Sequence, residues 1–157
     1  MPVRFWVLAA ICGALPDIDA IGHMLGVRYE SLWGHRGMMH SILFALIVGV
    51  AIATLAFSNV ERFSGTWWRL ATFFFIATIS HSVLDAMTTG GLGVAFFSPF
   101  DTTRYFFPFR PIEVSPIGIG AFFSKWGVRV LLSEFIWVWL PLLAITGITM
   151  LLRKMRG

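Results

Sequence analysis

The stretch MMHSILFALIVGVAIATLAF, Met38–Phe57, decides the fold class, because His40 is the one ionisable side chain in it. A helix needs about 20 apolar residues to cross the hydrocarbon core of a bilayer. The stretch therefore predicts a membrane-spanning helix. It also raises the question of why a histidine lies at the entrance of such a helix, since ionisable groups are costly in a membrane.

Three other stretches continue this pattern along the chain. Residues 68–88 and 130–152 are long and apolar, whereas residues 3–16 are apolar but shorter. A signal peptide is the alternative for the first stretch, and the lack of a small-residue cleavage site disfavours it. We therefore predict an all-α protein, a polytopic membrane helix bundle of about four transmembrane helices in one domain of all 157 residues. A long interfacial loop, residues 89–129, joins the last two helices.

The composition supports a membrane protein and argues against nucleic-acid binding. The chain is 57% hydrophobic and 13% charged, and its mean hydropathy is +0.80, whereas soluble domains are about one quarter charged. The net charge of +4 fits basic loops at lipid headgroups. The single cysteine, Cys12, has no partner for an internal disulfide. The expected partner is the lipid bilayer, and the expected location is the inner membrane of a bacterial or archaeal cell.

The polar side chains gather on one face of this predicted bundle. Spanning helices alternate in direction, so the first helix ends, the second begins, the third ends and the fourth begins at the same face. The basic residues near the helix ends weakly favour cytoplasmic termini, which puts this face outside the cytoplasm. The face receives Asp17, Asp19, His35, Arg36, His40, His81, Asp85 and Glu134.

The motif PDID, Pro16–Asp19, supplies two carboxylates at the end of the first helix. Proline interrupts helical hydrogen bonding, so we expect the helix to end at Pro16 and the two aspartates to lie in a non-helical turn. Carboxylates two residues apart in such a turn can face one ion. A turn or cap role is the alternative.

Two further motifs supply imidazoles. In GHRGMMHS, His35 precedes the predicted helix and His40 lies in its first turns. In HSVLD, His81 and Asp85 are four residues apart and so share one helix face. The alternative in each case is a buried polar residue that is satisfied by hydrogen bonds.

Together, three histidines and three aspartates supply enough ligands for one or two divalent ions. Zinc is the expected ion, with manganese or magnesium as alternatives because of the carboxylates. A metal with an open position lowers the pKa of bound water and favours hydrolysis. The predicted ligands are Asp17, Asp19, His35, His40, His81 and Asp85.

Three arginines fit an anionic, phosphate-bearing substrate. Arg104 and Arg110 lie among aromatic residues and prolines in the long loop, which we expect to cover the metal as a lid. Guanidinium groups bind phosphate with two parallel hydrogen bonds. Anchoring to lipid headgroups is the alternative. We predict catalytic roles for Arg36, Arg104 and Arg110, and a supporting role for Glu134, which needs a partner at its apolar helix start.

The combined prediction is a membrane-bound metal-dependent hydrolase that cleaves a phosphoester in a lipid-like substrate. A metal or proton transporter without catalytic activity is the alternative. Transporter sites usually lie near the bilayer midplane, whereas these polar groups lie at helix ends. A third interpretation is a small structural membrane protein whose polar groups satisfy one another.

The motifs LPDID, GHRGMMHS and HSVLDAMTTGG together resemble those of the YdjM-like family of membrane-bound metal-dependent hydrolases. The resemblance extends from Leu15 to about Pro116. The family is also grouped by distant similarity with zinc-dependent phospholipases C and P1-type nucleases, which implies phosphoester hydrolysis. The matching polar positions are Asp17, Asp19, His35, Arg36, His40, Ser41, His81 and Asp85.

Two departures from the family pattern affect the expected site. Members usually have an upstream helix with a Thr-His pair, which this sequence lacks. We expect Met1 to be an internal start and one metal ligand to be missing. Relatives also tend to have Phe-Thr or Phe-Ser before the second histidine of GHRGMMHS, so Met38 and Met39 replace a hydroxyl without disturbing the ligands.

Overall fold

The computed structural model describes residues 2–116, 120 and 123–156. Within them the regular elements are all helical, and the remaining pairing consists of two isolated bridges between extended residues. By main-chain contacts the chain divides into two compact units, Met1–Ala86 with Leu92–Phe107 and Met87–Gly91 with Pro108–Gly157. The helical elements are α1 (Val3–Ala14), η1 (Leu15–Ile18), α2 (Asp19–Met24), η2 (Met38–His40), α3 (Ile42–Leu55), α4 (Gly65–Ala86), α6 (Lys125–Glu134), η3 (Phe135–Trp139) and α7 (Leu140–Arg156).

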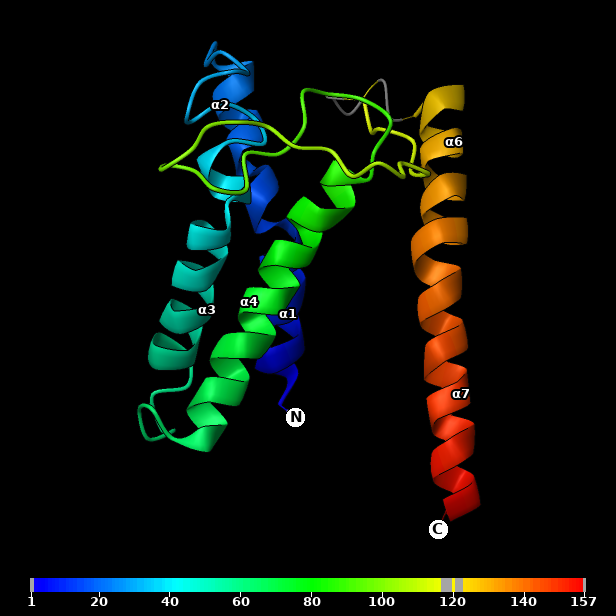
Figure 1. The fold of residues 1–157 in the computed structure, drawn as a ribbon. Coiled ribbons are helices and arrows are strands. Elements are labelled where there is room, and N and C mark those ends of the chain that lie inside the picture. The colour runs from blue at the N-terminus through cyan, green and yellow to red at the C-terminus, as the bar shows by residue number, and fades with distance from the viewer. Residues whose placement is uncertain (1, 117–119, 121–122, 157) are drawn as a thin grey trace. The chain divides into compact units, whose positions relative to one another are not determined.

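In the first unit, α4 packs against both α3 and α1 (Figure 1). Gly49 makes the α3–α4 contact close, because a Cβ there would lie 2.5 Å from the carbonyl oxygen of Ala71. Phe5, Phe57 and Phe74 are buried between the three helices. This apolar core fixes where the C-terminal end of α4 lies relative to the chain before α3.

The first α-helix ends at Ala14, close to the expected end at Pro16, but the expectation of a non-helical turn after it is wrong. α1 continues through the 3-10 turn η1 into α2, and Val3–Met24 together form one apolar helical stretch of 22 residues. Proline is tolerated here because it occupies the first positions of the 3-10 turn, where its missing N–H leaves little unsatisfied. Asp17 and Asp19 therefore lie on helical turns, not in an irregular one.

The second helix begins later than expected. His40 lies in the short 3-10 turn η2, and Ser41 is extended and caps α3 by accepting a hydrogen bond from the Phe44 backbone N–H at 3.1 Å. A serine cap satisfies one of the free N–H groups at a helix start. The break at Ser41 lets the backbone before it turn independently of α3.

The second unit contains one continuous helix, α6–η3–α7, which runs from Lys125 to Arg156. It begins before the expected start at residue 130, and η3 is a π-helical turn. Among the described residues, this helix and Val3–Met24 are both long and apolar enough to cross a bilayer, whereas α3 is apolar but shorter. Four transmembrane helices and an interfacial loop at residues 89–129 stay predictions.

Candidate metal centre

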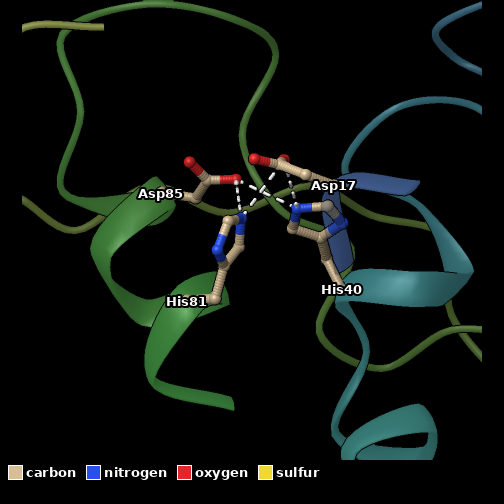
Figure 2. A group of neighbouring side chains, drawn as sticks. All are labelled: Asp17, His40, His81 and Asp85. Carbon is tan, nitrogen blue, oxygen red and sulfur yellow. Dashed lines mark ion pairs between the residues drawn. The ribbon is translucent and has the colours of Figure 1, made fainter. Parts of the chain in front are cut away.

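Four side chains from three parts of the chain point at one another in the first unit (Figure 2). His81 Nε2 lies 3.2 Å from Asp17 Oδ1 and 3.7 Å from Asp85 Oδ2. His40 Nε2 lies 3.1 Å from Asp85 Oδ2 and 3.8 Å from Asp17 Oδ1. The i, i+4 pair predicted on one helix face is therefore joined by a residue of η1 and a residue of η2.

These separations suit a tetrahedral divalent ion. Zinc binds nitrogen and oxygen ligands at about 2.0–2.1 Å, so neighbouring ligands of a tetrahedral site lie about 3.3 Å apart. The four nitrogen–oxygen distances above bracket this value. Moreover, the Nε2 atoms of His40 and His81 are buried and make no hydrogen bond of good geometry among the described residues. Two imidazole nitrogens without such a bond and two carboxylate oxygens are a suitable donor set for a metal.

His81 is held by the main chain of α1. Its Nδ1 lies 2.8 Å from the carbonyl oxygen of Gly13, so the ring N–H on this side donates and Nε2 faces the cluster. A metal-binding histidine commonly donates its other N–H to such an acceptor.

Asp19 holds the motif GHRGMMHS in place through contacts with three of its residues. Its Oδ1 lies 2.6 Å from His35 Nδ1, and its Oδ2 accepts from the Arg36 backbone N–H at 3.1 Å. Oδ2 also lies 3.0 Å from His40 Nδ1. Asp19 is nearly inaccessible to solvent. It therefore orients His40 so that the opposite ring nitrogen faces Asp17 and Asp85.

A second group of possible ligands shares a residue with the first. Ligand atoms of Asp17, Asp19 and His35 lie within 4.8 Å of one another. All six predicted ligands thus lie in one region, in two groups joined by Asp17. The first group is the stronger candidate, because both oxygens of Asp19 already have partners within the protein.

The two glycines of GHRG allow this tight turn. A Cβ at Gly34 would lie 2.2 Å from the carbonyl oxygens of Arg28 and Tyr29, and a Cβ at Gly37 would lie 2.4 Å from that of Leu32. Arg36 between them has a positive φ of 61°, which is unusual for a residue with a side chain. The motif therefore encodes a backbone shape as well as two imidazoles.

Replacement of Gly34 by alanine is expected to destabilise the protein by about 1–3 kcal/mol, because the new methyl group overpacks the turn, and to weaken metal binding. Gly13→Ala is the matched control, since a methyl group there would meet nothing within 4 Å. Chemical denaturation in detergent checks both variants. If Gly34→Ala were as stable as Gly13→Ala, the turn would tolerate a side chain at Gly34.

The charges of the cluster favour a divalent cation. Asp17, Asp19 and Asp85 carry three negative charges, and the guanidinium of Arg36 donates to Asp85 Oδ1 at 2.9 Å. If the histidines are neutral, the net charge of the three aspartates and Arg36 is −2. Buried charge is costly unless it is paired, so an ion of charge +2 would balance the set.

The pKa of His40 is shifted by its surroundings. Burial alone would lower it, but the carboxylates of Asp19 and Asp85 raise the pKa from 6.5 to about 9. A proton on His40 thus competes with a metal at neutral pH, because the neutral imidazole is the form that binds.

The affinity for zinc is therefore expected to rise by about tenfold per pH unit between pH 6.5 and 9, as one proton leaves His40. The stability of the metal-free protein should change in the opposite sense. Because the pKa of His40 is higher in the folded protein than in the unfolded chain, the proton on His40 stabilises the folded state. This contribution, about 3 kcal/mol, is complete below pH 6.5 and is lost as the pH rises through 9. Zinc titrations and denaturation curves across this range, with a chelator in the second case, check both slopes. A flat affinity would contradict the assignment.

Arg104 and Tyr29 hold the loop next to the cluster. The guanidinium of Arg104 donates to the carbonyl oxygens of Tyr29, His35 and Gly93 at 2.7, 2.9 and 3.3 Å, and it lies 5.2 Å from the centre of the Tyr29 ring. The Tyr29 ring also contacts His35 edge-on. These contacts give Arg104 a positioning role, and its predicted catalytic role is untested. The sequence gives no sign that Tyr29 belongs to the site, because aromatic residues are common near membrane surfaces.

The remaining predicted site residues are not members of the cluster. Arg36 reaches it through Asp85, whereas Arg110 and Glu134 belong to the second unit. Arg110 is exposed and Glu134 is half-buried. Their predicted roles toward a substrate stay predictions. His23, which the sequence does not single out as a ligand, contacts the Val27 carbonyl at 3.3 Å instead.

Comparison with known proteins identifies the family. The family model described as YdjM inner membrane protein matches residues 2–156. The chain belongs to the YdjM family. The resemblance noted for the three motifs is thereby confirmed across nearly the whole sequence. No solved structure matches the chain.

A curated relative is also described as an inner membrane protein. The chain is 35% identical to inner membrane protein YbcI of Escherichia coli (strain K12) over 147 residues, which cover 94% of this chain and 83% of the relative. With the apolar helices described above, these matches show an inner membrane protein.

Proposed function

We propose that the protein is a membrane-bound metal-dependent hydrolase that cleaves phosphoesters. The observation that carries this proposal is the convergence of His40 Nε2, His81 Nε2 and two carboxylate oxygens at ligand-to-ligand distances. The two imidazoles come from η2 and α4, which a purely local hydrogen-bond pattern would not bring together.

Different groups of the protein would have different roles at such a centre. A bound divalent ion would supply a water of lowered pKa and a positive charge toward phosphate. Asp19 and the Gly13 carbonyl orient the two imidazoles, and Arg36 holds Asp85. The Asp17 side chain is 54% exposed while that of His40 is fully buried. The cluster is therefore open at Asp17, which is where a substrate would approach.

The position of the cluster favours hydrolysis over transport. His40 precedes α3 and Asp85 lies one residue before the end of α4. His40 and Asp85 thus lie at the ends of their helices, whereas transporter sites usually lie near the midplane on broken helices.

The activity is tested with bis(4-nitrophenyl) phosphate and the purified full chain in detergent. We expect hydrolysis that a chelator abolishes and zinc or manganese restores, and that falls by at least about a hundredfold in His81→Gln. His23→Gln is the matched control, because His23 lies outside the cluster. If the protein bound the metal tightly but did not hydrolyse this phosphodiester, the proposed hydrolase activity would be refuted and only a metal-binding role would be supported.

A further inference from the structure

The cluster offers more protein ligands than a hydrolytic centre usually has. A catalytic zinc commonly has three protein ligands and one open position, and it expands to five ligands in some reactions. The four ligand atoms of the cluster and the water that hydrolysis requires already make five. A phosphate oxygen therefore has a place at the ion when one protein ligand leaves.

The charge of the site indicates that this ligand is a carboxylate. The three aspartates and Arg36 leave two negative charges when the histidines are neutral, and a divalent ion balances them. A neutral centre has no charge left over to attract an anion. If the anion takes the place of a carboxylate at the ion, one negative ligand replaces another and the ion stays neutralised.

Three of the four ligands are held by contacts behind them. His40 and His81 each use the ring nitrogen that faces away from the cluster for a contact within the protein, at 3.0 and 2.8 Å. Asp85 accepts from the Arg36 guanidinium with its second oxygen at 2.9 Å. Such partners fix the orientation of metal ligands. The side chains of these three ligands are also 18% exposed or less.

Asp17 differs from the other three ligands in both respects. Its Oδ1 lies 3.2 Å from His81 Nε2 and 3.8 Å from His40 Nε2, which are themselves ligand atoms. Among the described residues, its carboxylate makes no hydrogen bond or ion pair to a group outside the cluster. The side chain is 54% exposed, so water can hydrate it after it leaves the ion. A freed Asp85 would stay shielded from water, which is costly for a charge.

We infer that Asp17 is the exchangeable ligand of the centre, which leaves the ion when a phosphate binds while the other three ligands stay. The bond from Oδ1 to the ion breaks, a bond from a phosphate oxygen forms, and no proton or electron is transferred. Rotation of the side chain on η1 moves the carboxylate into water. The inference rests on the proposed function and deepens it, because it names the position through which the phosphate of a substrate reaches the ion.

Visible absorption of the full chain in detergent, loaded with one equivalent of Co2+, tests the exchange without relying on activity. Co2+ takes nitrogen and oxygen ligands as zinc does, and its spectrum changes with the identity and number of the ligands. Without phosphate, the spectra of the wild type and of Asp17→Asn should differ. With saturating inorganic phosphate they should coincide, because residue 17 is then off the ion in both. Asp17→Asn should also bind phosphate about tenfold more tightly, since no carboxylate has to be displaced.

Asp85→Asn is the matched control, because it removes a carboxylate of the same cluster and changes the charge by the same amount. Its spectrum should differ from that of the wild type with and without phosphate, since Asp85 stays on the ion. The inference is overturned if the spectra of Asp17→Asn and the wild type still differ at saturating phosphate, or if phosphate leaves the wild-type spectrum unchanged.

These results are distinguishable from a failure of the proposed function. Failure of the wild-type chain to bind Co2+ would refute the metal centre, and the inference with it. The expected spectra without hydrolysis of the phosphodiester would refute the activity and leave the exchange of Asp17 supported.

Discussion

Replacing His40 by glutamine is expected to abolish tight zinc binding, with a loss of affinity of at least about a hundredfold. His40 is completely buried, and its ring lies against three carboxylates, which belong to Asp17, Asp19 and Asp85. It is the imidazole that joins Asp19 to Asp85. Loss of residues that merely orient ligands already costs about 10–100-fold in metal affinity, so loss of a ligand should cost more. Competition with a chromogenic chelator in detergent measures the effect.

A buried substitution can also disturb folding, so a second variant is needed. His81 is 18% exposed and its backbone is held by the long helix α4, so His81→Gln should lose zinc with little loss of helical structure. His23→Gln should bind zinc like the wild type. Retention of wild-type affinity in both His40→Gln and His81→Gln would contradict the proposed centre.

The two aspartates of PDID are expected to contribute very differently to stability. Asp19→Asn should lower the free energy of unfolding by about 3 kcal/mol or more, because a buried carboxylate with three partners is replaced by a group that accepts at one atom only. Those partners are His35, the Arg36 backbone and His40. Asp17→Asn should change stability by less than about 1 kcal/mol, because the side chain is half exposed.

Metal binding should nevertheless fall in both variants. Asp17→Asn removes a ligand directly, whereas Asp19→Asn releases His40. Denaturation curves and zinc titrations of the same preparations separate the two effects. Equal destabilisation by both substitutions would show that Asp19 does not have the organising role described for it.

The apolar runs are sufficient to predict an all-helical chain, and the motifs with histidine and aspartate single out the side chains that the structure brings together. The 20 residues from Met38 to Phe57 have one ionisable side chain, and the spacing of His81 and Asp85 places them on one helix face. These patterns depend on side-chain chemistry and helical periodicity, both of which the sequence displays directly.

The supporting contacts could not be predicted in the same way. The acceptor of His81 is the main-chain carbonyl of Gly13, and the acceptors of Arg104 are also carbonyls. Every residue has a carbonyl, so no sequence pattern marks the one that is used. The helical path through Pro16 could not be predicted for a related reason. Proline disfavours the interior of an α-helix but fits the start of a 3-10 turn, and the choice depends on the packing around it.

The central claim is that Asp17, His40, His81 and Asp85 together hold a divalent ion. X-ray absorption at the zinc edge of the zinc-loaded full chain tests it most directly. The account predicts one zinc per chain with two imidazole nitrogens and with oxygen ligands from the carboxylates and from a bound water, at about 2.0–2.2 Å, and loss of the imidazole signal in the His40→Gln, His81→Gln double variant. A spectrum of oxygen ligands alone, or the same spectrum in that double variant, would contradict it.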